Sequence, residues 1–398
     1  MNGAAEFQEQ GFKVSRQPTP IGMGAVLWVG TIGMLICGVQ PVVLGALVDE
    51  NRLSSAGLGW ATTAEFLTLG LGIAIAGAVL RPRRLRLLAC IAVAITGLAD
   101  LMMFNETGVA ILINRAISGI GEALLVWITS CVIVRSAAPT RWAGIFLTAQ
   151  GISQLAFAAL VPLTLMADRG ANGGFLGLAF TAAAAIAAVP FLPDRLADLP
   201  ASEHARLKVL TAPASIMVLL CFFLIAAFSI GLFAYLAPLS TQSGFTEVQL
   251  GFTVSTVLGF SILGSTAAAF LPNLPYYPIL VVSVVVNALV LTVLYYLPSF
   301  PVFLIAGAVF GFFWLFFMPY QLPMAIEIDP SRQVAMVMGG AQLIGAAGGP
   351  FLCSMFVTDA EARGALIVVG TCFLFAFLIA TLLHFRHRSA IQMVAVER

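Results

Sequence analysis

INRAISGIGEALL, Ile113–Leu125, places an arginine and a glutamate inside an otherwise apolar helix. A helix advances about 100° per residue, so Arg115 and Glu122, seven residues apart, fall on one face two turns from each other. Ser118 and Gly119 lie between them. An ionised side chain in lipid costs several kcal/mol, so this polar stripe must face protein or a water-filled cavity. We therefore predict a functional site on this helix.

The composition is that of a membrane protein. Of the 398 residues, 60% are hydrophobic and 9% are charged, whereas soluble domains carry roughly 25% charged residues. Apolar stretches of about eighteen or more residues recur along nearly the whole chain, which predicts an all-α integral membrane protein embedded in the lipid bilayer. The charges are sorted by loop and form no basic patch, so no nucleic-acid partner is expected.

Twelve transmembrane spans are predicted, six on each side of a polar stretch. Their approximate bounds are 21–48, 59–80, 87–104, 109–134, 142–167, 175–192, 213–238, 250–271, 278–297, 302–326, 333–357 and 365–385. We expect Gln40 and Pro41 to interrupt the first span. The predicted domains are a tail 1–20, an N-terminal half 21–192, a linker 193–212, a C-terminal half 213–385 and a second tail 386–398.

The distribution of basic residues predicts the orientation. Placing the N and C termini in the cytoplasm assigns 15 of the 19 lysines and arginines to inside segments. Three lie outside (Arg52, Arg169 and Arg363), and Arg115 lies in the membrane. The inverse topology violates the positive-inside rule. We therefore predict cytoplasmic termini and a multi-pass protein of the cytoplasmic (inner) membrane.

Cysteine and histidine placement argues against an enzyme. The six cysteines lie within apolar spans without CxxC spacing, so we expect them to pack as small hydrophobic residues. The three histidines (His204, His384 and His387) lie outside the predicted membrane core. No nucleophile, base and orienting group or metal-ligand set can be assembled from the sequence. We predict no enzymatic activity, no metal site and no cofactor.

The fourth span carries a family pattern. Two six-span halves joined by a polar loop resemble the major facilitator superfamily of secondary transporters, and the resemblance covers essentially the whole chain. The family pattern in this span is an arginine, three residues and two glycines spaced by one, which matches Arg115, Gly119 and Gly121. The stretch Leu53–Trp60 is also similar to the start of the second span in many bacterial members. The resemblance implies two halves that rock about a central site.

The loop after the second span departs from that family. Its usual pattern is glycine, aspartate and glycine with basic residues, whereas here Arg81 lies near the place of the aspartate. The resemblance gives this loop a part in gating. The proline–glycine pattern of many drug and proton antiporters is absent from the fifth span, and its nearest echo lies in the eleventh. The candidate gating residues are Gly77, Arg81, Arg83, Arg84, Gly119, Gly121, Gly349 and Pro350.

Four ionisable residues inside the N-terminal half are the candidate proton-coupling groups: Glu122, Arg115, Glu65 and Asp100. Glu122 falls near the bilayer midplane, where a carboxyl group can exchange a proton as the cavity opens to either side. The alternative is that Arg115 forms a permanent ion pair with Glu65 or Asp100, and that Glu122 rests protonated against helix backbone. Glu65 and Asp100 can also reach the outer water.

The tenth span offers a second candidate site. Its stretch FGFFWLFFMPYQLP, Phe310–Pro323, contains two prolines that break the helix, and freed carbonyls can face a cavity. Packing or lipid contact is the alternative for its aromatic residues. Glutamines of the fifth span can bind substrate or a neighbouring helix. The candidate substrate-binding residues, several of them implied by the family's cavity-lining spans, are Arg115, Gln40, Trp28, Trp127, Gln150, Gln154, Tyr235, Trp314 and Gln321.

These observations predict a secondary transporter that moves a small organic molecule by alternating access, with a proton as the coupling ion. A free Arg115 would bind a substrate carboxylate, and symport of an organic acid or aromatic compound is slightly favoured. A paired Arg115 would favour export of a drug-like or lipophilic compound by proton antiport. A membrane sensor that binds its ligand without moving it is a further alternative. We expect a monomer.

Overall fold

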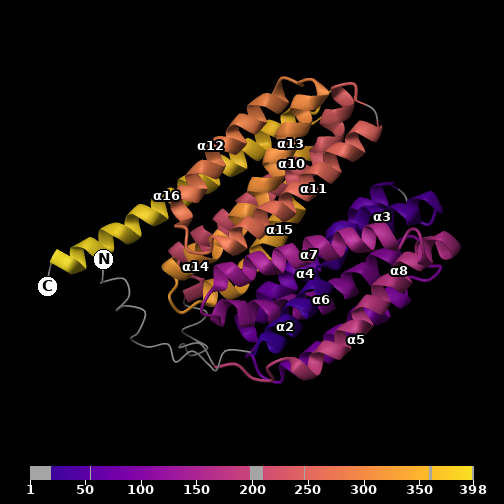
Figure 1. The fold of residues 1–398 in the computed structure, drawn as a ribbon, viewed down its shortest axis with the longest axis horizontal. Helices are drawn as coiled ribbons and strands as arrows, with labels where there is room; N and C mark the ends of the chain where they lie inside the picture. The colour runs from indigo at the N-terminus through magenta and orange to yellow at the C-terminus, as the bar shows by residue number, and fades with distance from the viewer. Residues whose placement is uncertain (1–18, 54, 198–208, 246, 358–360, 397–398) are drawn as a thin grey trace.

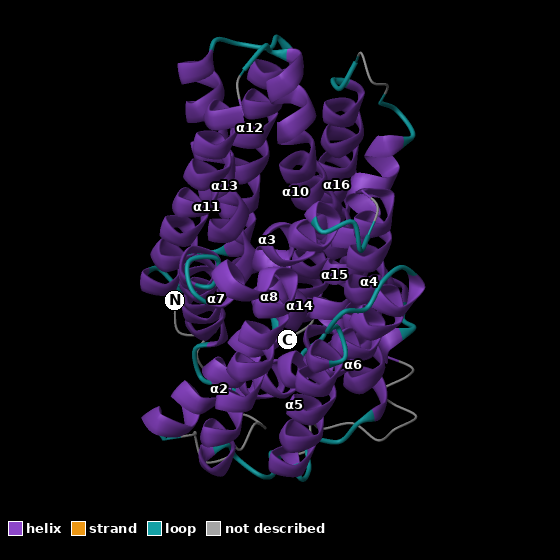
Figure 2. Cartoon of the chain, turned by 90° about the vertical axis from the view of Figure 1, so that its right-hand side faces the viewer, coloured by secondary structure: helices purple, strands orange, loops and turns teal. Residues whose placement is uncertain are grey.

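The computed structural model describes residues 19–53, 55–197, 209–245, 247–357 and 361–396. The regular elements in these ranges are helices (Figure 2), and large apolar side chains such as Leu163, Phe270 and Phe351 are exposed on the exterior. Helices satisfy their own backbone hydrogen bonds, which is what a lipid surrounding requires. Ten helices in the described ranges are long and apolar enough to cross a membrane. The predicted all-α membrane fold is confirmed.

The helices form two bundles (Figure 1). The first contains α2 (Pro20–Gly33), α3 (Leu35–Asp49), α4 (Ser55–Val79), α5 (Leu85–Leu101), α6 (Val109–Arg135), α7 (Pro139–Leu160), α8 (Leu165–Ala185) and the short η1 (Ile186–Phe191). The second contains α10 (Pro213–Gln242), α11 (Glu247–Phe270), α12 (Tyr276–Tyr295), α13 (Phe300–Phe317), η2 (Met318–Tyr320), α14 (Gln321–Ile328), α15 (Gln333–Ser354) and α16 (Gly364–Val396). Most of the predicted linker and N-terminal tail, and the last two residues, lie outside the described ranges.

The first span is broken, although not at the predicted place. Helix α3 continues through Gln40 and Pro41, and the break lies at Met34 between α2 and α3. A carbonyl at a helix break has no partner within the helix and needs another donor. Gln154 of α7 supplies it, because its Nε2 donates to the Met34 carbonyl at 2.8 Å. The segment α3 is therefore a separate helical unit.

The tenth span is broken where its prolines predict. Helix α13 ends at Phe317, η2 follows over Met318–Tyr320, and α14 begins at Gln321. The Tyr320 hydroxyl donates to the Leu271 carbonyl at 2.6 Å, which anchors the break against the end of α11.

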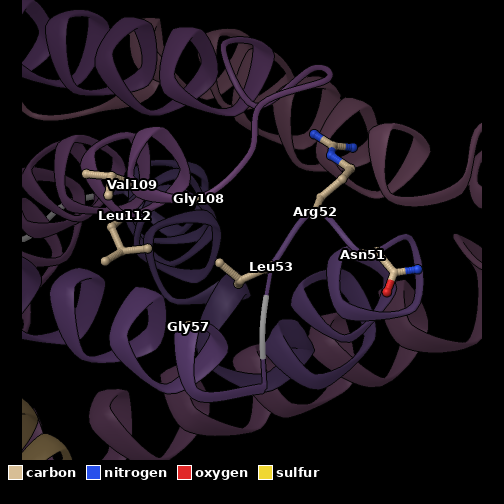
Figure 3. A pocket seen from close by; sticks show the side chains of 7 residues that line it. All are labelled: Asn51, Arg52, Leu53, Gly57, Gly108, Val109 and Leu112. Carbon is tan, nitrogen blue, oxygen red and sulfur yellow. The ribbon is translucent and has the colours of Figure 1, made fainter.

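Arg52 ties together the connections at one end of the first bundle. Its Nε donates to the Glu106 carbonyl at 2.9 Å, and its Nη1 donates to Asn172 Oδ1 at 2.8 Å. A hollow of about 440 Å³ lies beside it, lined in part by Leu53 and Leu112 (Figure 3). The buried charged side chains of the bundle do not line this hollow.

The two bundles contact each other through α4 with α15 and α7 with α11. A Cβ built on Gly70 would lie 3.1 Å from Ile344 Cγ1, and the Thr148 and Ser265 hydroxyls hydrogen-bond at 3.0 Å. These contacts lie in the half of the molecule nearer to the loop 81–86. We name this end of the molecule the arginine-loop end. The bundles diverge from the region of α14 toward α3 (Figure 1).

Candidate functional site: a buried charge cluster in the first bundle

Two glycines bring α4 and α5 close to α6. A Cβ built on Gly119 would lie 2.6 Å from the Glu65 carbonyl oxygen, and one on Gly121 would lie 2.7 Å from the Ala92 carbonyl oxygen. Only hydrogen fits at either place, and small residues are what permit such close helix contact. The pattern therefore positions acidic residues of α4 and α5 beside Arg115 on α6.

We expect Gly119→Ala to destabilise the protein, because the added methyl group must push α4 away from α6. Overpacking of this kind costs typically about 1–3 kcal/mol. Gly259→Ala on α11 is the matched control, since a Cβ there meets no heavy atom within 4 Å. Thermal unfolding of the purified variants in detergent measures the difference. Equal midpoints for the two variants would contradict the packing role.

Arg115 is held by two carboxyl groups. Its Nη1 donates to Glu65 Oε1 at 2.9 Å, and its Nη2 donates to Asp100 Oδ1. Its carbon Cζ also lies 5.3 Å from the ring centre of Phe175 on α8. Arg115 and Glu65 are 0% exposed and Asp100 is 2% exposed, so neither acid reaches water. Of the two alternatives for Arg115, the structure has the paired one, with both predicted acids as partners.

Glu122 is less completely satisfied. The Ser118 hydroxyl donates to its Oε1 at 3.1 Å, whereas its Oε2 is buried and has no hydrogen-bond donor in the described part of the chain. The side chain is buried, and its carboxyl group lies within hydrogen-bonding reach of that of Glu65. The second oxygen of Glu65 accepts a hydrogen bond from Gln40 Nε2 at 3.1 Å. Gln40 thus joins α3 to the cluster.

The cluster contains more acids than bases. Three carboxyl groups surround one guanidinium, and buried charges without a partner are strongly unfavourable. A proton on Glu122 removes one negative charge and gives the carboxyl group a hydrogen to donate toward Glu65. Adjacent carboxyl groups that cannot both ionise share a proton in this way. The arrangement can therefore hold one exchangeable proton.

The remaining polar candidates of the first bundle occupy different surroundings. Trp127 is completely buried, and its Nε1 has no acceptor among the described residues. Gln150 is buried on α7, and Gln154 is occupied at the break of the first span. Trp28 is 41% exposed on α2. Of the predicted substrate-binding residues, only Gln40 and Arg115 hydrogen-bond within the cluster.

The candidates of the second bundle gather around α13. The Trp314 ring stacks on Phe310 with ring centres 5.7 Å apart. It also contacts Phe233 of α10, with ring centres 5.5 Å apart. Tyr235 is half-buried and packs against the same core. Gln321 accepts a hydrogen bond from Gln342 Nε2 at 2.9 Å. The second bundle thus contains an aromatic region around Trp314 and a separate hydrogen-bonded pair of amides, Gln321 and Gln342.

Besides Gly119 and Gly121, the predicted gating residues lie in three places. Gly77 lies at the contact between the bundles, since a Cβ there would lie 2.7 Å from Val337 Cγ1. Gly349 and Pro350 lie on α15, where a Cβ on Gly349 would lie 2.3 Å from the Ala227 carbonyl oxygen of α10. The three loop arginines are exposed, and Arg84 precedes α5 with a positive φ of 55°. These three candidates are Arg81, Arg83 and Arg84.

Two arginines at the contact between the bundles were not among the predicted site residues. Arg332, just before α15, donates from Nη1 to the Val134 carbonyl near the end of α6. Arg135 Nη1 lies 3.4 Å from Met336 Sδ of α15. Burial and then the charge of Arg135 lower the pKa of Arg332. Helix C-termini attract cations, which favours this placement. The sequence signal for this contact is a basic residue at the C-terminal end of α6, Arg135, and another just before α15, Arg332.

We expect Arg332→Gln to loosen the arginine-loop end. A hydrogen bond from a charged donor contributes roughly 1.5–3 kcal/mol, so its loss shifts the population of this conformation about tenfold or more. Cysteines introduced at Ile73 and Gly339 report the contact, because a Cβ on Gly339 would lie 3.7 Å from Ile73 Cγ2. Their cross-linking should slow in Arg332→Gln and stay unchanged in Arg141→Gln, an exposed arginine. Equal rates would contradict the role of Arg332.

Comparisons with known proteins agree on one family. The family model described as Major Facilitator Superfamily matches residues 26–351. No curated protein sequence matches the chain.

Solved structures of several transporters are similar over nearly their whole length. FucP in an outward conformation has a TM-score of 0.72 at 12% identity, covering 91% of this chain and 98% of that one. The human organic anion transporter MFSD10 has a TM-score of 0.72 at 14% identity, covering 91% and 100%. The proton:xylose symporter XylE has a TM-score of 0.68 at 14% identity, covering 90% and 94%. At these identities the likeness shows the fold.

Proposed function

The chain belongs to the Major Facilitator Superfamily, and from that premise we propose that it couples the passage of a small organic molecule to the passage of a proton. The family and its structural neighbours are transporters, so this chain is a multi-pass membrane transporter and not an enzyme. Two neighbours, XylE and the E. coli fucose symporter FucP, are proton symporters, which supports coupling to a proton here.

The observation that carries the proposal is the carboxyl oxygen of Glu122 that lacks a donor. It lies in a buried cluster with three acids and one arginine, next to the carboxyl group of Glu65. A permanent structural ion pair needs two acids at most. The third acid adds a site at which a proton binds and leaves without breaking the bonds of Arg115.

The pairing of Arg115 also bears on the substrate. Both terminal nitrogens of the buried Arg115 guanidinium already bind carboxyl groups, and only its buried Nε lacks an acceptor in the described part of the chain, so the paired fork that binds a carboxylate is taken. The reason to favour an organic acid is thereby removed. The aromatic region around Trp314 favours a lipophilic or aromatic body instead, and aromatic faces also attract cations. We therefore place a neutral or cationic lipophilic substrate, exchanged for a proton, ahead of an organic acid.

The conformation fits the first half of such a cycle. If the arginine-loop end is cytoplasmic, as the distribution of basic residues predicts, the bundles are closed toward the cytoplasm. This corresponds to an outward-facing state. In the proposed cycle the cluster, which is buried in this conformation, opens to the outer side to exchange its proton, and rocking of the bundles then exposes it to the inner side.

Transport into liposomes that contain the purified protein tests the proposal. An imposed pH gradient is combined with three probes: a lipophilic cation, a neutral aromatic compound and an aromatic carboxylate. We expect the first or second to move together with a measurable opposite proton flux. Movement of the carboxylate alone would overturn the substrate class. Movement of any probe without proton flux would overturn the coupling.

A further inference from the structure

We propose that Gln40 is a positioning residue that makes α3 follow the state of the carboxyl cluster. This inference rests on the proposed proton coupling. It assigns a role to the hydrogen bond that joins α3 to the cluster, from Gln40 Nε2 to Glu65 Oε2 at 3.1 Å. Both side chains are buried, so water does not compete for this bond.

The helix that carries Gln40, α3, is separated from α2 by a break in the first span. The break at Met34 detaches α3 from α2, and Gln154 of α7 holds the broken end. At the other end, Glu50 Oε1 accepts a hydrogen bond from the Ala171 backbone N–H at 2.6 Å. The first attachment lies close to the cluster, because a Cβ built on Gly33 would lie 3.0 Å from the Glu122 carbonyl oxygen, but neither attachment is a hydrogen bond to a carboxyl group of the cluster. Gln40 therefore provides the polar contact through which a change in the cluster reaches the middle of α3.

The two oxygens of Glu65 have different partners. Arg115 binds Oε1 and Gln40 binds Oε2. When Glu122 loses its proton, two ionised carboxyl groups face each other and repel. The Glu65 carboxyl group remains bound to Arg115 through Oε1. Repulsion from Glu122 therefore moves mainly its Oε2, which is the atom that Gln40 binds. A glutamine amide can donate or accept, and it keeps its bond whichever way the carboxyl group is protonated.

The titratable groups around this contact belong mainly to the cluster. Glu65, Asp100, Arg115 and Glu122 face it from α4, α5 and α6, and Cys37 on α3 interacts with Glu65 and Glu122. Helix α2 carries no charged residue. The charged residues of the other helices packed on α3 lie away from its middle. They are Arg141 at the start of α7, and Asp168 and Arg169 near the start of α8.

Hydrogen–deuterium exchange of the full-length protein in lipid nanodiscs tests the inference at acidic and alkaline pH, with labelling times scaled for intrinsic exchange. In the wild type, peptides from α3 should exchange at different rates at the two pH values. This difference should be lost in Gln40→Met, which fills the same space without a hydrogen bond. Gln154→Met is the matched control. It should speed exchange at the start of α3 at both pH values and leave the difference in place.

The protonation of the cluster is followed separately by the infrared band of its carboxylic acid. If Gln40→Met keeps both the pH response of this band and the pH response of α3, the role of Gln40 is overturned while proton coupling stands. If the wild type shows the band response without any response of α3, the inference also fails. If the wild type shows no band response, the proposed proton exchange itself fails.

Discussion

Glu122→Gln should abolish the accumulation of substrate driven by a pH gradient while leaving exchange of substrate across the membrane intact. Glutamine has the shape of the protonated acid, so it can accept from Ser118 and donate toward Glu65. The cluster therefore keeps its structure but has lost its exchangeable proton. One pH unit corresponds to about 1.4 kcal/mol per proton, or a tenfold concentration ratio, which falls to one in the variant.

Two transport assays on the same liposomes separate these effects: uptake driven by an imposed pH gradient, and exchange of labelled for unlabelled substrate without a gradient. Glu106→Gln makes the same chemical change in a connection at the Arg52 end and should behave as the wild type. Retention of gradient-driven uptake by Glu122→Gln would show that coupling lies elsewhere. Loss of exchange as well would point to a structural role for Glu122.

Arg115→Met should be the most destabilising substitution in the cluster. It leaves Glu65 and Asp100 buried without their cation, and removal of one partner from a buried ion pair costs about 3–5 kcal/mol. The variant should unfold at a markedly lower temperature in detergent. Arg141→Met removes an exposed arginine and should change stability by no more than about 0.5 kcal/mol.

A triple variant distinguishes lost pairing from lost packing. In Arg115→Met combined with Glu65→Gln and Asp100→Asn, the buried acids are neutral and no longer need a cation. Replacing a buried ionic group as a unit is often neutral or stabilising. We expect thermal stability to recover in the triple variant. If it stays as unstable as Arg115→Met alone, the guanidinium acts chiefly by filling space against Phe175.

Part of the site follows directly from the sequence. Helix periodicity placed Arg115, Ser118 and Glu122 on one face, and the Ser118–Glu122 hydrogen bond lies on that face. The sequence also offered Glu65 or Asp100 as a partner of Arg115, because both lie at a comparable depth in their spans. It could not show that both bind at once. That depends on how closely α4 and α5 approach α6, which Gly119 and Gly121 determine through contacts far away in sequence.

Other features of the fold depend on contacts between residues far apart in sequence, which helix periodicity does not reveal. The first span breaks at Met34 and not at Gln40 and Pro41, because a donor from Gln154, 120 residues away, is available there. By contrast, the break of the tenth span is local and follows its prolines. The contact of Arg332 with Val134 joins residues 198 positions apart in different bundles. Its sequence signal was a single basic residue before a span, which topology alone also explains.

The central claim is that the cluster holds a proton on Glu122 and can release it. Infrared difference spectroscopy of the wild type and Glu122→Gln in lipid, recorded as the pH is raised, tests this claim without a substrate. We predict a carboxylic-acid C=O band that disappears with increasing pH in the wild type and is missing from Glu122→Gln. A wild type without a titrating band, or a band that is identical in the two proteins, would contradict the claim.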